Sequence, residues 1–278
     1  MINLSLFLLL YFRLMKYAFT LIAIALGVLL YAKFTETEIT EKQMIKDKIK
    51  IEVWSDVVCP FCLLGKKKME QAIAKYNAED KVEIIWRSFQ LDPTFPQNTS
   101  TPSKENLVNR KGYPKTQVDA MCGQLESQGT AYNIHFDFDK AVTFNTWDAH
   151  RLLQWSKTLQ KSHELKEALM KAHFGEGRDL SKQEQIIAVV KSVGLDDKQA
   201  LEVLNSEQYT IEVQQDISKA QSLGIRGVPY FLINGEEVIS GAQSDAVFER
   251  MVLSGLSGLT ETADSTATGV CTPEGECK

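Results

Sequence analysis

Cysteine is scarce in this chain, whose 278 residues include five. Small secreted proteins that rely on disulfides contain more cysteines for their length, and this chain is long enough to bury a hydrophobic core without disulfides. The five form two close pairs and one single residue, namely Cys59 with Cys62, Cys271 with Cys277, and Cys122. An odd number of cysteines with one C-x-x-C spacing excludes a disulfide scaffold and indicates thiols that take part in chemistry.

A surplus of basic residues is also missing. Lys and Arg number 31 against 36 Asp and Glu, which gives a net charge of −5. Binding to phosphates needs an excess of positive charge, so we expect no nucleic-acid partner. A hydrophobic fraction of 44% with 24% charged residues excludes both wholesale disorder and a polytopic membrane protein.

The sequence lacks the second half of a zinc site. One C-x-x-C supplies two ligands, but neither a second C-x-x-C nor a closely spaced histidine pair follows, and Cys271 and Cys277 lie too far apart to replace them. We therefore expect no metal ion and no bound cofactor.

Long uncharged runs occur only near the start of the chain. Residues 1–12 and 17–32 carry no charge, and Arg13 and Lys16 lie between them. A helix over 17–32 spans about 24 Å, and flanking lysines extend it toward the roughly 30 Å of a hydrocarbon core. The run ends with too few small residues for a cleaved signal peptide. We expect an apolar helix over 1–34 that anchors the protein in a membrane.

The cations precede the apolar run, so the anchor is expected to place the domain outside the cytoplasm, in the periplasm. The polar stretch 35–48 then serves as a tether. An alternative stays open, because a translation start near Met44 would remove the anchor and give a cytoplasmic protein.

Residues 49–92 have the pattern of a β-α-β unit. Alternating residues over 49–54 predict a strand, apolar residues at helical spacing follow Cys62, and residues 82–89 predict a second strand. Parallel strands joined through a helix form a right-handed crossover.

Residues 93–207 are predicted to form an all-helical insertion. Three prolines end the β-α-β pattern, and apolar residues at helical spacing then recur over 163–174 and 184–193, with no convincing strand between 103 and 206. We expect these helices to pack over the face that bears the cysteines.

Residues 208–256 return to the α/β pattern. A helix is expected over 209–223, and strands over 230–233 and 236–239 are joined by Asn-Gly, a strong signal for a type I′ hairpin turn. A last helix is predicted over 243–253. The Ser/Thr/Gly-rich remainder, 257–278, is predicted to be a flexible tail, so the sequence describes one α/β domain interrupted by helices.

The C-x-x-C motif falls between a strand and a helix. Unpaired N–H groups at the start of that helix favour a thiolate at Cys59, and Pro60 suits this position because its missing N–H has no intrahelical partner. A lowered pKa would make Cys59 a nucleophile. Cys62, expected to be more buried, lies on the same side and can resolve a mixed disulfide formed at Cys59. The spacing thus favours dithiol–disulfide exchange.

Gly227-Val228-Pro229 stands directly before a predicted strand. The simple interpretation is a proline that begins a strand. The functional interpretation is a cis Val228–Pro229 bond that faces the C-x-x-C and leaves the Val228 backbone free to pair with an extended substrate.

Several motifs together resemble the FrnE-type branch of the DsbA-like thioredoxin-fold oxidoreductases. They are Ile51 to Cys62, Ser88-Phe89-Gln90-Leu91-Asp92-Pro93, Asn145-Thr146-Trp147-Asp148-Ala149-His150-Arg151 and Gly224-Ile225-Arg226-Gly227-Val228-Pro229. The resemblance spans residues 49–253. It implies a thioredoxin-like fold with a helical insertion, Cys59 as attacking and Cys62 as resolving cysteine, Pro229 as the cis-proline, and a substrate groove bordered by the insertion.

The resemblance also implies protein substrates that contain cysteines, and a partner that recycles the dithiol. Pro60-Phe61 replaces the Pro-His of strongly oxidising DsbA proteins, so we expect a weaker oxidant. The superfamily includes glutathione-dependent isomerases and transferases with serine in the place of Cys59, and retention of both cysteines argues against that chemistry. A redox-regulated binding module is a further alternative.

The remaining candidates are weaker. Pro60 and Phe61 are expected to contact the substrate together with Val228 and Pro229. Phe61 and Trp54 are expected at the rim of the site, and His150 is a candidate to line it. Cys122 is expected to be a small buried hydrophobic residue. Cys271 and Cys277 either relay electrons to the C-x-x-C or form an idle disulfide.

Overall fold

The computed structural model describes residues 27, 31, 33 and 48–265. The predicted anchor and tether, 1–34 and 35–48, fall almost entirely outside the described residues, as do Met44, Cys271 and Cys277. Within the part that is described, no helix combines the length and the apolar character needed to cross a membrane. Residues 1–48 form a unit separate from 49–278, and the rest of the description concerns the second unit.

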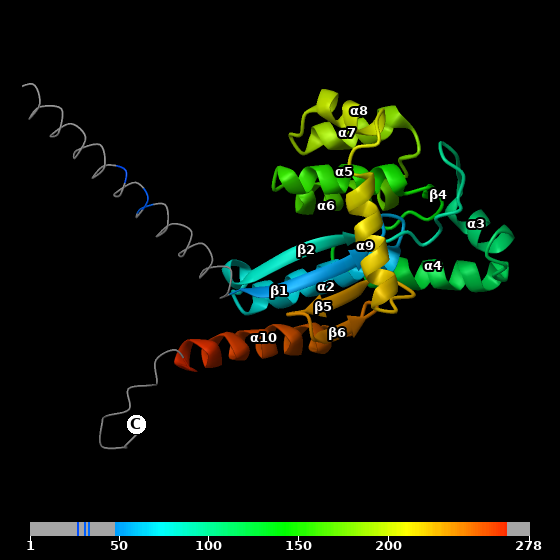
Figure 1. Ribbon diagram of the computed structural model, residues 1–278. Helices are drawn as coiled ribbons and strands as arrows, with labels where there is room; N and C mark the ends of the chain where they lie inside the picture. The colour runs from blue at the N-terminus through cyan, green and yellow to red at the C-terminus, as the bar shows by residue number, and fades with distance from the viewer. Residues whose placement is uncertain (1–26, 28–30, 32, 34–47, 266–278) are drawn as a thin grey trace, which may run out of the picture. The chain divides into compact units, whose positions relative to one another are not determined.

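A four-stranded sheet in the order β2-β1-β5-β6 forms the centre of this unit (Figure 1). β1 pairs in parallel with β2 and antiparallel with β5, and β5 pairs antiparallel with β6. The strands are β1 (Ile49–Ser55), β2 (Val82–Ser88), β5 (Tyr230–Ile233) and β6 (Glu237–Ser240). The parallel pair follows from the predicted β-α-β crossover.

Helices cover both faces of the sheet. On one face, α2 (Pro60–Lys75) and α10 (Asp245–Ser265) pack with Ile51, Phe231 and Phe248 in one core cluster. On the other face, α9 (Thr210–Ser222) packs against Trp54. A short 3-10 helix, η1 (Glu79–Lys81), leads from α2 to β2. Because the sheet is covered on both faces, β1 is buried along nearly its whole length.

The insertion contributes the largest hydrophobic cluster, which also includes Cys62, Leu63 and Leu64 of α2. Its helices are α3 (Ser103–Asn109), α4 (Lys115–Thr130), α5 (Trp147–Thr158), α6 (Ser162–Phe174), α7 (Gln183–Ser192) and α8 (Asp197–Leu204). The insertion therefore packs on the cysteine-bearing end of α2, as expected.

The prediction of an all-helical insertion needs one correction. β3 (Ser100–Pro102) and β4 (Val142–Phe144) pair antiparallel in a small second sheet. Three residues are too few to show a strand period, and the partners lie some forty residues apart, so the sequence pattern does not reveal them.

The hairpin between β5 and β6 and the last helix each depend on a glycine. Asn234 and Gly235 both have positive φ, as the predicted turn requires, and Glu236 N–H donates to Ile233 O at 3.0 Å. The last helix extends beyond its predicted end, through Ser265. A Cβ at Gly255 would lie 2.7 Å from Ile49 Cδ1, so glycine here permits the helix to pack closely on β1.

Candidate functional site

The two cysteines of the C-x-x-C stand where β1 leads into α2. Cys59 is the N-cap of α2, and Pro60 occupies the first helical position. Cys59 N–H donates to Asp56 O at 3.3 Å and Cys62 N–H to Cys59 O at 3.1 Å, so the loop and the first helical turn hold both thiols. The side chains are 3% and 2% exposed, and both are reduced. Cys62 is therefore not markedly more buried than Cys59, contrary to the prediction.

A second segment meets the dithiol from far along the chain. The Val228–Pro229 peptide bond is cis, and Cys59 Sγ donates to Val228 O at 3.5 Å. Gly65, one turn beyond Cys62, makes this approach possible, because a Cβ there would lie 3.1 Å from Pro229 Cγ. The loop before β5 therefore packs directly against the start of α2.

The pKa values of the two thiols shift in opposite directions. The hydrogen bond with Cys62, together with burial, raises the pKa of the Cys59 thiol well above its usual range. Burial opposes ionisation of Cys62, but the hydrogen bond from Cys59 and the positive charge of Lys166 lower the pKa of Cys62. The prediction of a lowered pKa at Cys59 is wrong for the reduced pair, because the hydrogen bond with Cys62 and burial act against its ionisation.

A buried acid lies directly beside the pair. Asp56 accepts from Leu91 N–H at 2.8 Å, and its Oδ1 lies 3.3 Å from His150 Nε2. Burial opposes its ionisation, but the hydrogen bonds with His150 and Leu91 and the charge of Lys166 lower the pKa of Asp56. Asp56 and Lys166 were not singled out from the sequence. The acidic residue three positions before Cys59 is a signal that could have identified Asp56.

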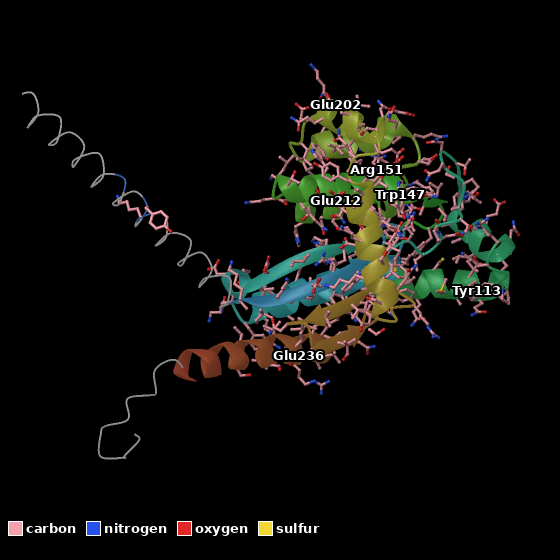
Figure 2. All side chains as sticks on the ribbon, viewed as in Figure 1. Tyr113, Trp147, Arg151, Glu202, Glu212 and Glu236 are labelled. Atoms are coloured by element: carbon pink, nitrogen blue, oxygen red, sulfur yellow. The ribbon has the colours of Figure 1, made fainter. Side chains whose placement is uncertain are left out.

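An apolar groove with a volume of about 480 Å³ opens beside Cys59. Its lining comes from the C-x-x-C loop, the cis-proline loop and helices α3 and α4, and includes Cys59, Pro60, Phe61, Tyr113, Met121 and Val228. Phe61 and Tyr113 are 41% and 45% exposed at its edge, and Figure 2 labels Tyr113 in the connection between α3 and α4. The insertion thus borders the groove, as the resemblance implied.

Other predicted site residues lie elsewhere. The prediction that Trp54 lines the rim is wrong, because Trp54 is fully buried under α9 and donates through Nε1 to Asp216 O at 3.0 Å. His150 does not line the groove itself but lies behind Asp56. Cys122 is buried, as expected, yet it is among the groove-lining residues, and burial raises the pKa of its thiol.

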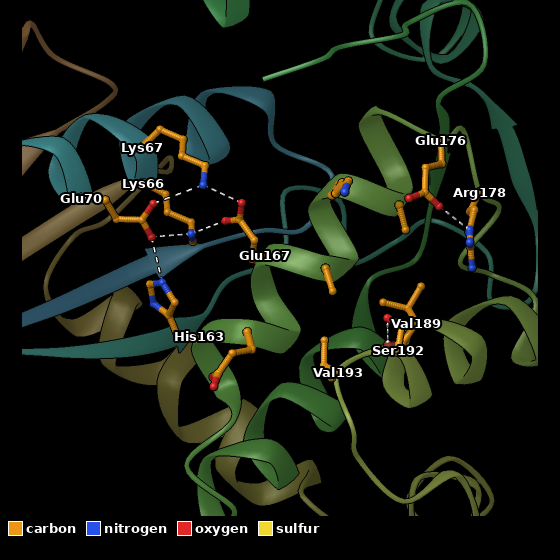
Figure 3. A pocket seen from close by; sticks show the side chains of 14 residues that line it. Lys66, Lys67, Glu70, His163, Glu167, Glu176, Arg178, Val189, Ser192 and Val193 are labelled. Atoms are coloured by element: carbon orange, nitrogen blue, oxygen red, sulfur yellow. Dashed lines mark hydrogen bonds and ion pairs between the residues drawn. The ribbon is translucent and has the colours of Figure 1, made fainter. Parts of the chain in front are cut away.

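A hollow of about 680 Å³ lies between α2, α6 and α7 (Figure 3). Several of its charged groups pair with one another, among them Lys67 with Glu167 at 2.6 Å and His163 with Glu70 at 2.9 Å. No cysteine lines it, and we assign the chemistry to the groove beside Cys59. In the part of the chain that the structure describes, no group of three or more His, Cys, Asp or Glu is arranged to hold a metal ion.

Comparison with known proteins agrees with this geometry. A family model described as a DSBA-like thioredoxin domain matches residues 50–252. The uncharacterized protein YwbO of Bacillus subtilis is 29% identical over 209 residues, which cover 73% of this chain and 96% of that protein.

Solved structures give the same picture. A probable DsbA oxidoreductase of Streptomyces coelicolor has a TM-score of 0.71 and 29% identity, covering 83% of this chain and 98% of that one. A putative protein disulfide isomerase of Nitrosomonas europaea shares the fold, with a TM-score of 0.57, 14% identity and coverage of 76% and 98%. The predicted resemblance to DsbA-like proteins and the predicted thioredoxin-like fold are confirmed. The chain belongs to the family of proteins with a DSBA-like thioredoxin domain.

Proposed function

We propose that the protein is a thiol–disulfide oxidoreductase that exchanges its Cys59–Cys62 dithiol with cysteines of protein substrates. One observation carries the proposal. Both thiols lie one turn apart at the start of α2, and Cys59 Sγ faces the Val228 carbonyl at the mouth of the apolar groove. The similarity to a probable DsbA oxidoreductase supports the same activity.

The reaction begins with the reduced Cys59–Cys62 dithiol. When a substrate disulfide enters the groove, Cys59 loses its proton to solvent and attacks one substrate sulfur, so the substrate S–S bond breaks and a mixed disulfide forms. The leaving substrate thiolate takes up a proton. Cys62 then loses its proton, attacks Cys59 Sγ and releases the second substrate thiolate, which takes up that proton. The substrate gains two electrons, the dithiol loses two, and the reverse sequence oxidises a substrate.

The groove fits an extended peptide segment. Its walls are largely apolar, with Phe61, Met121 and Val228 among them, and the cis-proline loop adjoins Cys59. A backbone segment placed there would pair with Val228 while its apolar side chains enter the groove. Such recognition selects unfolded or extended protein chains over small thiols.

Single cysteine variants test the proposal. Cys59→Ser should abolish reduction of a peptide disulfide, a loss of at least a hundredfold, because no mixed disulfide forms. Cys62→Ser should still form the mixed disulfide and then stall, which mass spectrometry of the non-reduced protein detects. Turnover with glutathione that survives Cys62→Ser would instead indicate a glutathione-dependent isomerase or transferase. Retained exchange in Cys59→Ser would contradict the proposal.

We also propose that residues 1–34 anchor the protein in a membrane with the domain on the periplasmic side, where a partner recycles the dithiol. The uncharged runs with cations before them support this topology. Trapping mixed disulfides in cells with Cys62→Ala tests it, because the captured proteins reveal their compartment. Captured cytoplasmic proteins alone would favour a start near Met44 and contradict the anchor.

A further inference from the structure

Part of the groove beside Cys59 is lined by side chains from the core of the insertion. Phe138, Phe144 and Phe174 belong to the large hydrophobic cluster, and each is at most 6% exposed. A peptide backbone that pairs with Val228 would not contact such buried rings by itself. The groove therefore offers these rings to a substrate side chain.

Two uncharged polar side chains line the same groove. Asn106 lies on α3 and is 5% exposed, and Thr146 is the N-cap of α5 and is 2% exposed. Thr146 directly precedes Trp147, which Figure 2 labels at the start of α5. Within the described residues, neither side chain forms a hydrogen bond, and the Thr146 hydroxyl does not cap its helix. Because buried polar groups are nearly always paired, both positions call for a hydrogen-bonding ligand.

The Thr146 hydroxyl is open to the groove. Other buried polar atoms without a partner are sealed from the surface within the described part of the chain, namely Ser55 Oγ, Trp86 Nε1 and His173 Nδ1. The polar atoms of Thr146 and Asn106 are not sealed in this way. Thr146 lines the groove, whereas Asn106 borders both the groove and a second hollow beside Arg110. Thr146 is therefore the main polar group that a ligand in the groove would meet.

The charged residues that line the groove already have partners. Asp56 Oδ1 lies 3.3 Å from His150 Nε2, and Asp92 accepts from Lys111 Nζ at 2.9 Å. A charged side chain that entered the groove would lose its water without gaining a counter-ion. A purely apolar side chain would leave the Thr146 hydroxyl without a partner. The group that fits best is a neutral side chain with an aromatic body and a hydrogen-bonding end.

We infer that Thr146, together with Asn106, forms a specificity pocket for a tyrosine side chain close to the cysteine of a protein substrate. The phenol ring would contact the buried phenylalanines. Its hydroxyl would pair with the Thr146 hydroxyl and the Asn106 amide, each of which can donate or accept. The inference rests on the proposed function, which brings a substrate cysteine to Cys59. It adds a choice among substrates, because segments with tyrosine in this pocket are preferred to segments with phenylalanine.

Peptides that cannot react test the pocket. Each peptide has serine in place of cysteine and carries tyrosine or phenylalanine at one of the neighbouring positions on either side, and fluorescence anisotropy measures its affinity for the full chain. At one position or more, the tyrosine peptide should bind about tenfold more tightly than the phenylalanine peptide. Thr146→Val should remove this preference by weakening the tyrosine peptide alone, and Thr146→Ser should keep it. Thr158→Val, the same change at the other end of α5 and outside the groove, should alter neither affinity.

Equal affinities for the tyrosine and phenylalanine peptides at every position would overturn the inference, as would a preference that Thr146→Val leaves unchanged. If Thr146→Val does not fold, Asn106→Leu decides, because it removes the second hydrogen-bonding group from a different helix. An unchanged tyrosine preference in that variant would then overturn the inference. The binding measurement involves no disulfide exchange. Tyrosine selection by a protein that fails to reduce peptide disulfides would count against the proposed function, and normal exchange without selection would count against the pocket.

Discussion

His173 shows how a single residue makes stability depend on pH. The ring is buried between Phe144 and Phe174, and its Nδ1 has no hydrogen-bond partner within the described structure. Burial lowers the pKa of His173 to about 4. Below its ordinary pKa the unfolded chain binds a proton that the folded protein rejects, so stability falls as the pH drops from about 6.5 toward 4, by about 3 kcal/mol.

The expected result is a free energy of unfolding that depends less steeply on pH in His173→Leu than in the native protein over that window. Urea unfolding followed by circular dichroism at several pH values measures it. His135→Gln, at an exposed histidine, serves as control and should keep the native slope. Parallel curves for the native protein and His173→Leu would show that His173 is not the cause.

At the residue scale, the sequence identifies the chemistry but not its surroundings. Cys59 and Cys62 are visible because a local spacing encodes them, and the cis-proline segment is visible as a local motif. Lys166 is not, since the Ser55 carbonyl to which it donates lies more than one hundred positions away and a lysine on a helix is usually exposed. The pKa prediction for Cys59 failed because the hydrogen bond with Cys62 and burial raise the pKa of this thiol, and neither effect follows from helix position alone.

At the scale of elements, the contact between α2 and the cis-proline loop depends on Gly65. A methyl group at this position would lie 3.1 Å from Pro229 Cγ and 3.2 Å from Phe231 Cζ. Alanine gains about 1 kcal/mol in helix propensity, but overpacking costs about 1–3 kcal/mol. Gly65→Ala should therefore destabilise the protein by about 1 kcal/mol and slow peptide-disulfide exchange severalfold, because the loop that faces Cys59 must move.

Gly123→Ala is the matched control, because an added Cβ on this residue of α4 meets open space. It should stabilise the fold by up to about 1 kcal/mol through helix propensity and leave exchange unchanged. Stopped-flow exchange and thermal unfolding of both variants make the comparison. If Gly65→Ala and Gly123→Ala had the same thermal stability and the same exchange rate, the close approach at Gly65 would not matter for exchange.

Most elements could be predicted from periodicity, with ends that differ by one or two residues. The helices over 163–174 and 184–193 are confirmed as α6 and α7. The failures share one cause, since β3 with β4 and the extension of α10 depend on tertiary contacts. Arg151 illustrates this dependence, because its guanidinium on α5, labelled in Figure 2, donates to the Gln208 carbonyl at 2.9 Å and so joins the insertion to the chain before α9.

At the scale of the whole molecule, α10 determines what the tail can reach. It runs in the same direction as α2, since Lys68 contacts the Gln243 carbonyl and Lys75 pairs with Glu249. The axis of α2 is about 24 Å long, and the part of α10 from Glu249 to Ser265 adds about 24 Å beyond the end of α2. The end of α10 therefore lies about 45 Å from Cys59, on the side of the domain away from the groove (Figure 1).

Chain length then limits a relay through the tail cysteines. Cys271 is six residues beyond Ser265, so it extends at most about 20 Å, and Cys277 about 40 Å when fully stretched. By these lengths Cys271 cannot reach Cys59 of the same chain, and Cys277 falls about 5 Å short of it even when the tail is fully stretched.

Removal of residues 266–278 should accordingly leave the rate of peptide-disulfide exchange by the reduced protein within about twofold of the full chain, because loop closure over such a span contributes no useful effective concentration. Single-turnover kinetics at several protein concentrations measure this rate, and Cys271→Ser with Cys277→Ser provides a control that keeps the tail. A tenfold loss in both variants that is independent of protein concentration would show transfer within one chain, and would require α10 to unwind before the tail could reach the dithiol.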